Sequence, residues 1–185
     1  MTDNTQRFIV ISGGPGSGKS TLIDALEKQG FARTQEAGRA IIQEQAAIGG
    51  SALPWADRAL FAELMLSWEM RSHVMAKQAE GPVFFDRGVP DVAGYLMLCG
   101  LPVPKHVEEA ANRIRYNRTV FLAPPWREIF AQDAERRQDY DEAVRTFAAM
   151  EQTYRRFGYD IAPLPKASVA ERVDFMRAAL PSVFL

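Results

Sequence analysis

The sequence has very few of the residues that build disulfide frameworks and metal clusters. Cys99 is the one cysteine among 185 residues, and His73 and His106 are the two histidines. A single cysteine excludes an intrachain disulfide and a cysteine-based zinc site, and the H-E-x-x-H pattern is missing as well. We therefore interpret the histidines as surface or hydrogen-bonded core residues, and Cys99 as a core residue of an apolar segment.

The chain also lacks an excess of charge and a long hydrophobic run. A net charge of −1 at pH 7 gives no electrostatic basis for wholesale nucleic-acid binding. The longest uncharged stretch, 92–104, is interrupted by glycine and proline and is too short to span a bilayer. Residues 1–7 are polar, unlike a secretory signal. We expect one cytoplasmic domain over 1–185, with no nucleic-acid or membrane partner.

What the sequence does contain is a complete phosphate-binding loop between a predicted strand, 8–11, and a predicted helix, 21–29. The motif G-x-x-x-x-G-K-[ST] is matched at every fixed position, and the predicted nucleotide contacts are Gly13, Gly14, Pro15, Gly16, Ser17, Gly18, Lys19, Ser20 and Thr21. The glycines let successive backbone N–H groups point at a phosphate, and the helix adds the positive end of its dipole. Lys19 would reach the β- and γ-phosphates, and the Ser20 hydroxyl would bind Mg²⁺.

Strand and helix patterns alternate along the rest of the chain. Further strands are predicted at 31–35, 83–85, 119–122 and 159–162, and helices at 39–47, 57–78, 91–98, 105–115, 139–157 and after the Ser168–Glu171 capping box. The apolar residues that recur at helical spacing in the long helix are Leu60, Phe61, Leu64, Met65, Trp68 and Met75. Those expected to face inward in helix 139–157 are Val144, Phe147, Tyr154 and Phe157. Such alternation is typical of a parallel sheet covered by helices on both faces.

A second chemical signal is Asp86, which follows the buried strand 83–85 directly. A carboxylate at this end of a strand lies at the edge where open α/β folds bind ligands. P-loop enzymes use such an aspartate to hold Mg²⁺, so we predict Ser20 and Asp86 as the metal residues. The alternative for Asp86 is a turn or helix cap. The next residue, Arg87, is predicted to bind a phosphate, or to pair with Asp91 or another acid.

In these features the chain resembles small P-loop kinases of the nucleoside and nucleotide kinase type, and most of all the AAA-domain group that shares a core with nicotinamide riboside kinases. The stretches that carry the resemblance are GGPGSGKS at 13–20, EAGR at 36–39, VFFDRGVPD at 83–91, QDAERR at 132–137 and the segment 154–175. The resemblance implies a three-layer P-loop NTPase fold with five parallel strands in the order 2-3-1-4-5. It also implies base contacts near 163–166, and acceptor roles for Glu36, Asp86 and Arg87. Deoxynucleoside kinases usually carry Ser or Tyr where this chain has Gly88.

The spacing after the second strand points independently to an acceptor site. About 45 residues separate Glu36 from Val83, whereas a crossover helix needs roughly a dozen. We predict an acceptor-binding segment at 36–80, with Glu36, Arg39 and Trp55 as contacts and the long helix as its wall. Glu36 is also the candidate general base. The alternative is an additional helix of the core, with Trp55 packed beside Pro54.

Residues 124–141 are predicted to form a lid. Arg127, Arg136 and Arg137 stand here among acidic residues, and a closing arginine stabilises the charge that develops in phosphoryl transfer. The resemblance favours Arg136 as the catalytic arginine. A mixed-charge, solvated helix face is the alternative.

Together these patterns predict an enzyme that binds ATP and Mg²⁺ and transfers the γ-phosphoryl group to an unidentified small-molecule acceptor. The alternative is a nucleotide-binding or slowly hydrolysing regulatory ATPase module that acts through a protein partner. The guanine-reading sequence Asn-Lys-x-Asp is missing, and a mechanical AAA+ ATPase is disfavoured because no C-terminal helical lid domain is evident.

Overall fold

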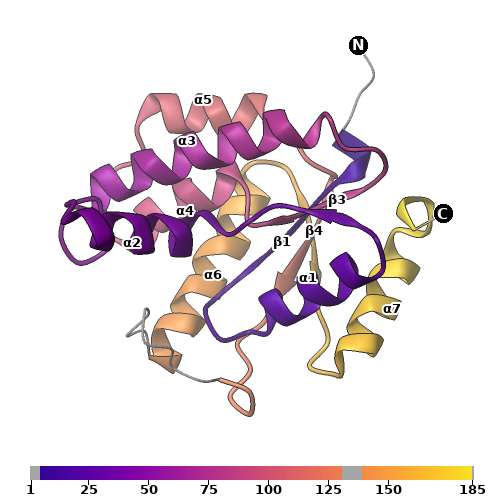
Figure 1. Cartoon of the computed structure of the whole chain (residues 1–185). Coiled ribbons are helices and arrows are strands. Elements are labelled where there is room, and N and C mark those ends of the chain that lie inside the picture. The colour runs from indigo at the N-terminus through magenta and orange to yellow at the C-terminus, as the bar shows by residue number, and fades with distance from the viewer. Residues whose placement is uncertain (1–4, 131–138, 185) are drawn as a thin grey trace.

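The computed structural model describes residues 5–130 and 139–184, and within them a central sheet (Figure 1). The strands are β1 (Phe8–Gly13), β2 (Ala32–Arg33), β3 (Val83–Asp86), β4 (Thr119–Ala123) and β5 (Asp160–Pro163). All pairings are parallel, and the order is β2-β3-β1-β4-β5. The predicted α/β class and strand order are confirmed.

Helices connect the strands and cover both faces of the sheet. They are α1 (Lys19–Lys28), α2 (Ala37–Ile48), α3 (Arg58–Ala76), α4 (Val89–Leu98), α5 (Lys105–Arg113), α6 (Tyr140–Arg156) and α7 (Val169–Ala179), with short 3-10 turns at Thr5–Arg7 and Pro181–Val183. Figure 1 shows α1 and α7 on one side of the sheet and α3 to α6 on the other. No helix among the described residues is long and apolar enough to cross a membrane.

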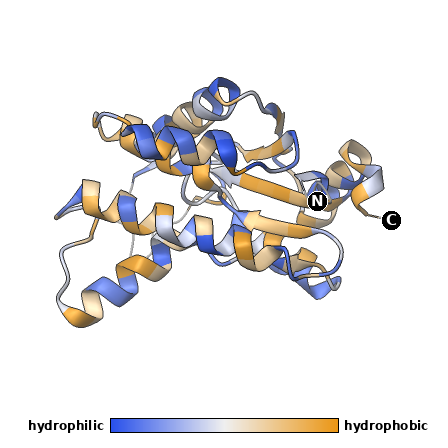
Figure 2. Cartoon of the chain, turned by 90° about the horizontal axis from the view of Figure 1, so that it is seen from above, coloured by the Kyte–Doolittle hydropathy of each residue, from blue (hydrophilic) through white to orange (hydrophobic). Residues whose placement is uncertain are grey.

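Alternation of side chains along the strands produces two hydrophobic cores. In β1, Phe8 and Val10 pack with the helices α3 to α6, whereas Ile9 and Ile11 pack with α1 and α7. Hydrophobic strands therefore lie between helices with mixed hydropathy, as Figure 2 shows from above. A third, smaller cluster joins α2 to α3. Met65 and Tyr95 pack against both this cluster and the core on the α3 to α6 side, so the segment after β2 is joined to that core.

The structure corrects single residues of the predicted inward faces of two helices. In α3, Phe61 is buried as the pattern indicates, but Leu60 and Met75 are exposed, and Leu66 and His73 are buried. In α6 and at its end, Tyr154 and Phe157 are buried as predicted, but Val144 is exposed. The inward residue there is Ala143, because α6 packs so closely on the phosphate-binding loop that a Cβ at Gly14 would lie 2.6 Å from the carbonyl oxygen of Ala143.

Strand β2 is shorter than the predicted 31–35. Phe31 instead packs edge-on against Phe84 and Phe184. His73 is a structural residue, as predicted. Its Nε2 lies 3.0 Å from the carbonyl oxygen of Arg115, and its pKa is lowered, mainly because the ring is buried.

Candidate active site

The phosphate-binding loop joins β1 to α1 and has the shape of an anion cradle. A Cβ at Gly13, where φ is 134°, would lie 2.4 Å from the carbonyl oxygen of Ala123, so only glycine fits there. The Lys19 side chain is 6% exposed, and its Nζ donates to the carbonyl oxygen of Gly14 at 2.9 Å. The Ser17 hydroxyl donates to the same oxygen at 2.8 Å. The loop thus holds its lysine against the backbone at the start of a helix, where an anion is stabilised.

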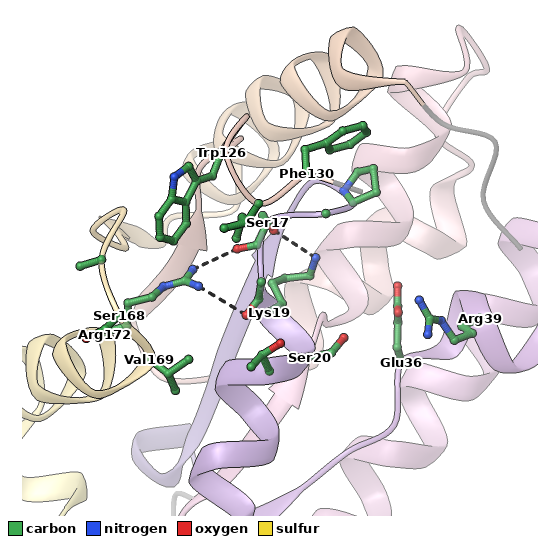
Figure 3. A pocket seen from close by; sticks show the side chains of 16 residues that line it. Ser17, Lys19, Ser20, Glu36, Arg39, Trp126, Phe130, Ser168, Val169 and Arg172 are labelled. Atoms are coloured by element: carbon green, nitrogen blue, oxygen red, sulfur yellow. Dashed lines mark hydrogen bonds between the residues drawn. The ribbon is translucent and has the colours of Figure 1, made fainter. Parts of the chain in front are cut away.

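A first cavity of about 550 Å³ opens on this loop (Figure 3). It is lined by Pro15, Gly16, Ser17, Gly18, Lys19, Ser20, Thr21, Glu36, Arg39, Trp126, Ile129, Phe130, Ala167, Ser168, Val169 and Arg172. Seven of the nine predicted nucleotide contacts are in that lining, Pro15 to Thr21. Gly13 and Gly14 are not, because they pack against the backbone of Ala123 and Ala143.

Two lining residues of the first cavity escaped the sequence analysis. Arg172 of α7 is almost fully buried, and its two terminal nitrogens donate to the carbonyl oxygens of Ser17 and Gly18, at 3.2 and 3.4 Å. Burial lowers its pKa. Trp126 follows β4 and lies on the same cavity (Figure 3). The missed signal was a tryptophan directly after the Pro124-Pro125 strand terminator.

The base contacts expected near 163–166 stay a prediction. Leu164 is buried in the core between the sheet and α7, and in this segment the lining of the first cavity begins at Ala167. Ala167, Ser168 and Val169, at the N-terminus of α7, are the lining residues next to the expected range. The Ser168–Glu171 capping box that starts α7 is present as predicted.

Asp86 ends β3, in register with Ile11 of β1 and therefore beside the strand that leads into the loop. It is buried, and its backbone N–H donates to Thr34 Oγ1 at 3.2 Å. Ser20 lines the first cavity. A hydroxyl and a carboxylate are donors that Mg²⁺ accepts when phosphate and water oxygens complete its octahedron. The described residues contain no group of three or more His, Cys, Asp or Glu able to hold a metal, so such an ion would depend on the nucleotide.

Arg87 lies between two acids directly after β3. Its Nε donates to Glu36 Oε1 at 3.3 Å and its Nη1 to Asp91 Oδ1 at 3.4 Å. Burial alone would lower the pKa of the guanidinium, but the carboxylates of Glu36, Asp91 and Asp86 outweigh it and raise that pKa. The backbone φ of Arg87 is 74°, a conformation that costs energy for a residue other than glycine.

Asp91, which pairs with Arg87, is itself held by three further hydrogen bonds. It accepts hydrogen bonds from the Ser12 hydroxyl, the Tyr154 hydroxyl and the backbone N–H of Gly88, the last at 2.9 Å. Two roles were predicted for Arg87, phosphate binding or pairing with an acid, and the pairing with Asp91 is present in the structure. Arg87 nevertheless also lines a second cavity.

The second cavity has a volume of about 390 Å³ and is lined by residues of α2, α3, α4 and α6. Its walls are mainly apolar and aromatic, and the lining includes Glu36, Ile42, Trp55, Phe61, Met65, Glu69, Arg87, Asp91, Val92, Tyr95 and Cys99. Three of the four predicted acceptor contacts are there: Glu36, Trp55 and Arg87. Arg39 is not, because it lines the first cavity. Trp55 is 64% exposed, so it is not packed into the core, and half-buried Cys99 lines this cavity rather than a core.

Glu69 is the unexpected member of that lining. It is 3% exposed, and its Oε2 has no hydrogen-bond partner in the described part of the chain. Burial, and then the negative charges of Asp91, Asp86 and Glu36, raise its pKa well above the usual value, against a smaller opposite effect of Arg87. The missed signal was an acid three residues after Leu66 and four before His73, on the inward face of α3.

The two cavities adjoin, because Pro15 and Glu36 line both. Of the predicted lid, Trp126, Ile129 and Phe130 line the first cavity, and the Arg127 guanidinium lies over the Tyr140 ring at 4.5 Å. Arg136 and Arg137 lie outside the described residues.

The fold and the loop define a kinase-like P-loop α/β protein, with a phosphate cradle at the carboxyl edge of a 2-3-1-4-5 sheet. Residues 8–172 match the profile of a family described as AAA domain, and the chain belongs to that family. Comparison with curated proteins gives no match.

Solved structures of kinase-like proteins share this fold at low identity. Deoxyadenosine kinase from M. mycoides with the products dCMP and a flexible dCDP superimposes with a TM-score of 0.69, at 15% identity, over 95% of this chain and 100% of that one. The same enzyme with bound dATP gives 0.60, at 14% identity, over 95% and 99%. NadR protein in complex with NR gives 0.73, at 15% identity, over 96% of this chain and 52% of that one.

Proposed function

We propose that this protein is a kinase that transfers the γ-phosphoryl group of MgATP to a hydroxyl group of a small acceptor. The observation that carries the proposal is the pair of adjoining cavities, which meet at Pro15 and Glu36. A protein that only binds or hydrolyses a nucleotide needs one cavity at the phosphate-binding loop. A kinase needs a second, placed so that its ligand reaches the terminal phosphate.

In this proposal the first cavity binds ATP. The backbone N–H groups of residues 14–18 hold the phosphates, and Lys19 supplies a point charge at the β- and γ-phosphates. Ser20 and Asp86 hold Mg²⁺, which when bound neutralises charge on the phosphate oxygens. Trp126 offers an aromatic face to the base, and Arg172 keeps the loop in position from α7.

The second cavity binds the acceptor, and Glu36 is the general base. The hydroxyl proton moves to the Glu36 carboxylate as the acceptor oxygen forms a bond to the γ-phosphorus, and the bond to the bridging oxygen breaks with release of ADP. Arg87, held 3.3 Å from Glu36, orients that carboxylate. The apolar walls exclude water, which protects the phosphoryl group from hydrolysis. The nucleotide- and nucleoside-related ligands named for the structures of the same fold are compatible with such an acceptor.

The test is product formation with a panel of acceptors. The protein is incubated with ATP, Mg²⁺ and nucleosides, nucleotides, sugars or cofactor precursors, and phosphorylated products are detected by mass spectrometry. Glu36→Gln should lower the rate of transfer about 10² to 10⁴-fold because the base is lost. Glu44→Gln, on the exposed side of α2, is the matched control and should have no effect. If no panel member were phosphorylated, the proposal would be rejected.

A further inference from the structure

Glu69 occupies a position at which a helix of this kind normally carries an apolar residue. The other members of the buried face of α3 are Phe61, Ala62, Leu66, His73 and Ala76. Glu69 is as buried as they are, it lines the second cavity, and its Oε2 has no hydrogen-bond partner among the described residues. A buried polar atom without a partner destabilises the folded state, so a purely structural role does not explain it.

The charged groups that act on Glu69 come from several elements around it. They are Glu36 before α2, Asp86 at the end of β3, and Arg87 and Asp91 around the start of α4. The Tyr116 hydroxyl, whose own pKa is raised mainly by burial, is a neutral neighbour. Arg87 is already paired with Glu36 and Asp91. Burial and this negative surrounding raise the pKa of Glu69 and so favour its neutral carboxylic acid form, which has an O–H group that can donate.

The walls beside Glu69 are suited to a planar ring. Phe61 and Tyr95 are in edge-to-face contact, with ring centroids 5.4 Å apart, and Met65 and Val92 continue the same lining. A cavity with apolar walls and a few convergent polar groups binds small organic ligands and orients them through the polar groups. A phosphate group beside Glu69 would meet the carboxylates of Glu36 and Asp91, and Arg87 there is already paired with both. The other two arginines of the lining, Arg58 and Arg145, are exposed.

We propose that Glu69 is a specificity-determining residue of the second cavity, where its buried carboxyl group hydrogen-bonds an uncharged, ring-bearing acceptor such as a nucleoside and disfavours the phosphorylated form of that acceptor. The inference rests on the proposed function for the identity of the cavity, but it concerns binding and not transfer. It gives a role in acceptor binding to Glu69, a residue that belongs to none of the sequence motifs.

The experiment measures thermal unfolding without ATP, first with no ligand and then with adenosine, guanosine, cytidine, uridine and their 5′-monophosphates. The variants are Glu69→Met, which is apolar and of similar length, and Glu69→Gln, which stays neutral and polar. Glu63→Met places the same side chain at an exposed position of α3 as a control. Without ligand, Glu69→Met should unfold about 2–4 °C above the wild type, because an unsatisfied buried acid is removed.

At least one ribonucleoside should raise the unfolding temperature of the wild type, of Glu69→Gln and of Glu63→Met, whereas its monophosphate should not. Glu69→Met should lose that shift. Where transfer to the nucleoside is detected, Glu69→Met should raise KM at least about tenfold and change kcat little, the pattern of lost ground-state binding.

Four results would overturn the inference: a Glu69→Met protein less stable than the wild type, a nucleoside shift that survives in it, an equal shift by the monophosphate, or no nucleoside shift in the wild type. Because ATP is left out, none of these results bears on phosphoryl transfer itself. Transfer is judged separately, by product detection over the whole acceptor panel.

Discussion

Lys19 shows at the scale of one residue how a charge is held in place for a ligand. Its ammonium group is buried and donates to the carbonyl oxygen of Gly14 in its own loop. A neutral carbonyl is a weaker partner for an ammonium than the charged oxygens of a nucleotide phosphate, because charge-assisted hydrogen bonds are about twice as strong. The side chain is therefore oriented before binding, and a hydrogen bond to a phosphate oxygen would be stronger than the one to this carbonyl.

Replacement of Lys19 by alanine should abolish turnover and weaken ATP binding about 10- to 100-fold, the effect of losing a hydrogen bond to a charged group. Lys28→Ala, at the exposed end of the same helix, is the control and should bind ATP normally. Titration calorimetry measures the affinity, and circular dichroism checks that the fold is retained. Undiminished turnover in Lys19→Ala would remove the loop from the mechanism.

Asp86 is expected to act on the metal and not on the nucleotide. Asp86→Asn keeps the size of the side chain but removes the charge, so Mg²⁺-dependent turnover should fall strongly while Mg²⁺-free nucleotide binding changes little. Asp160→Asn, an exposed carboxylate at the start of β5, is the control. The measurement is the rate of ATP consumption as a function of Mg²⁺ concentration. A normal Mg²⁺ dependence in Asp86→Asn would show that Asp86 has only a structural role, as a cap at the end of β3.

The sequence predicted the residues of the site that lie in a contiguous pattern. The phosphate-binding loop is of this kind, because each fixed position in it has a backbone reason. Glu69, Trp126 and Arg172 could not be found in this way. They come from three elements far apart in the chain, and each is one acidic, aromatic or basic residue in a helix or loop where many such residues are only solvated or packed. Only the tertiary contacts distinguish them.

At the scale of elements, helix α7 supports the phosphate-binding loop from outside it. Arg172 is the contact, since its two terminal nitrogens donate to Ser17 and Gly18. The rest of α7 is held by Val173 and Met176 in the core shared with α1. The helix therefore stays in place without the arginine, and the effect of losing Arg172 should appear at the loop.

Arg172→Met should consequently weaken ATP binding about tenfold, with a small loss of thermal stability, because the loop loses two hydrogen bonds to a charged donor. Arg177→Met on the exposed side of α7 is the matched control. Nucleotide titration followed by fluorescence and thermal unfolding measures the two effects. Equal ATP affinity in both variants would show that α7 does not position the loop.

The existence and order of the elements followed from the sequence, and so did part of the inward faces of α3 and α6. Leu60, Met75 and Val144, however, are large apolar residues that the structure leaves exposed. In α6 the small residue Ala143 decides the face, because it permits close approach to Gly14. In α3 the inward side carries a glutamate and a histidine, and hydrophobicity alone gives no reason to expect them there.

At the scale of the whole molecule, the two cavities adjoin in a way that would let the proposed nucleotide and acceptor meet. Glu36 lines both and is tied to Arg87, which is tied in turn to Asp91 and so to β1 and α6 through Ser12 and Tyr154. A nucleotide and an acceptor bound together would contact the same group of buried charges. Such an arrangement favours a kinase, in which two bound ligands react with each other, over a regulatory module that changes conformation when it binds a nucleotide alone.

The regulatory ATPase alternative can be separated from the kinase on this basis. A kinase should consume ATP slowly alone and much faster when its acceptor is added, because closure over both ligands assembles the site.

Arg136, outside the described residues, is predicted to complete that closed site. Arg136→Ala should then lower the transfer rate on the order of 10³-fold, with little loss of ATP affinity. The neighbouring Arg137→Ala should cost much less. Steady-state ATP consumption with and without acceptor, together with ATP titrations, measures these effects.

A regulatory module would show neither acceptor stimulation nor a large effect of Arg136, and would instead bind a protein partner differently in its ATP and ADP states. That combination, found in a pull-down with each nucleotide, would replace the kinase by the regulatory module.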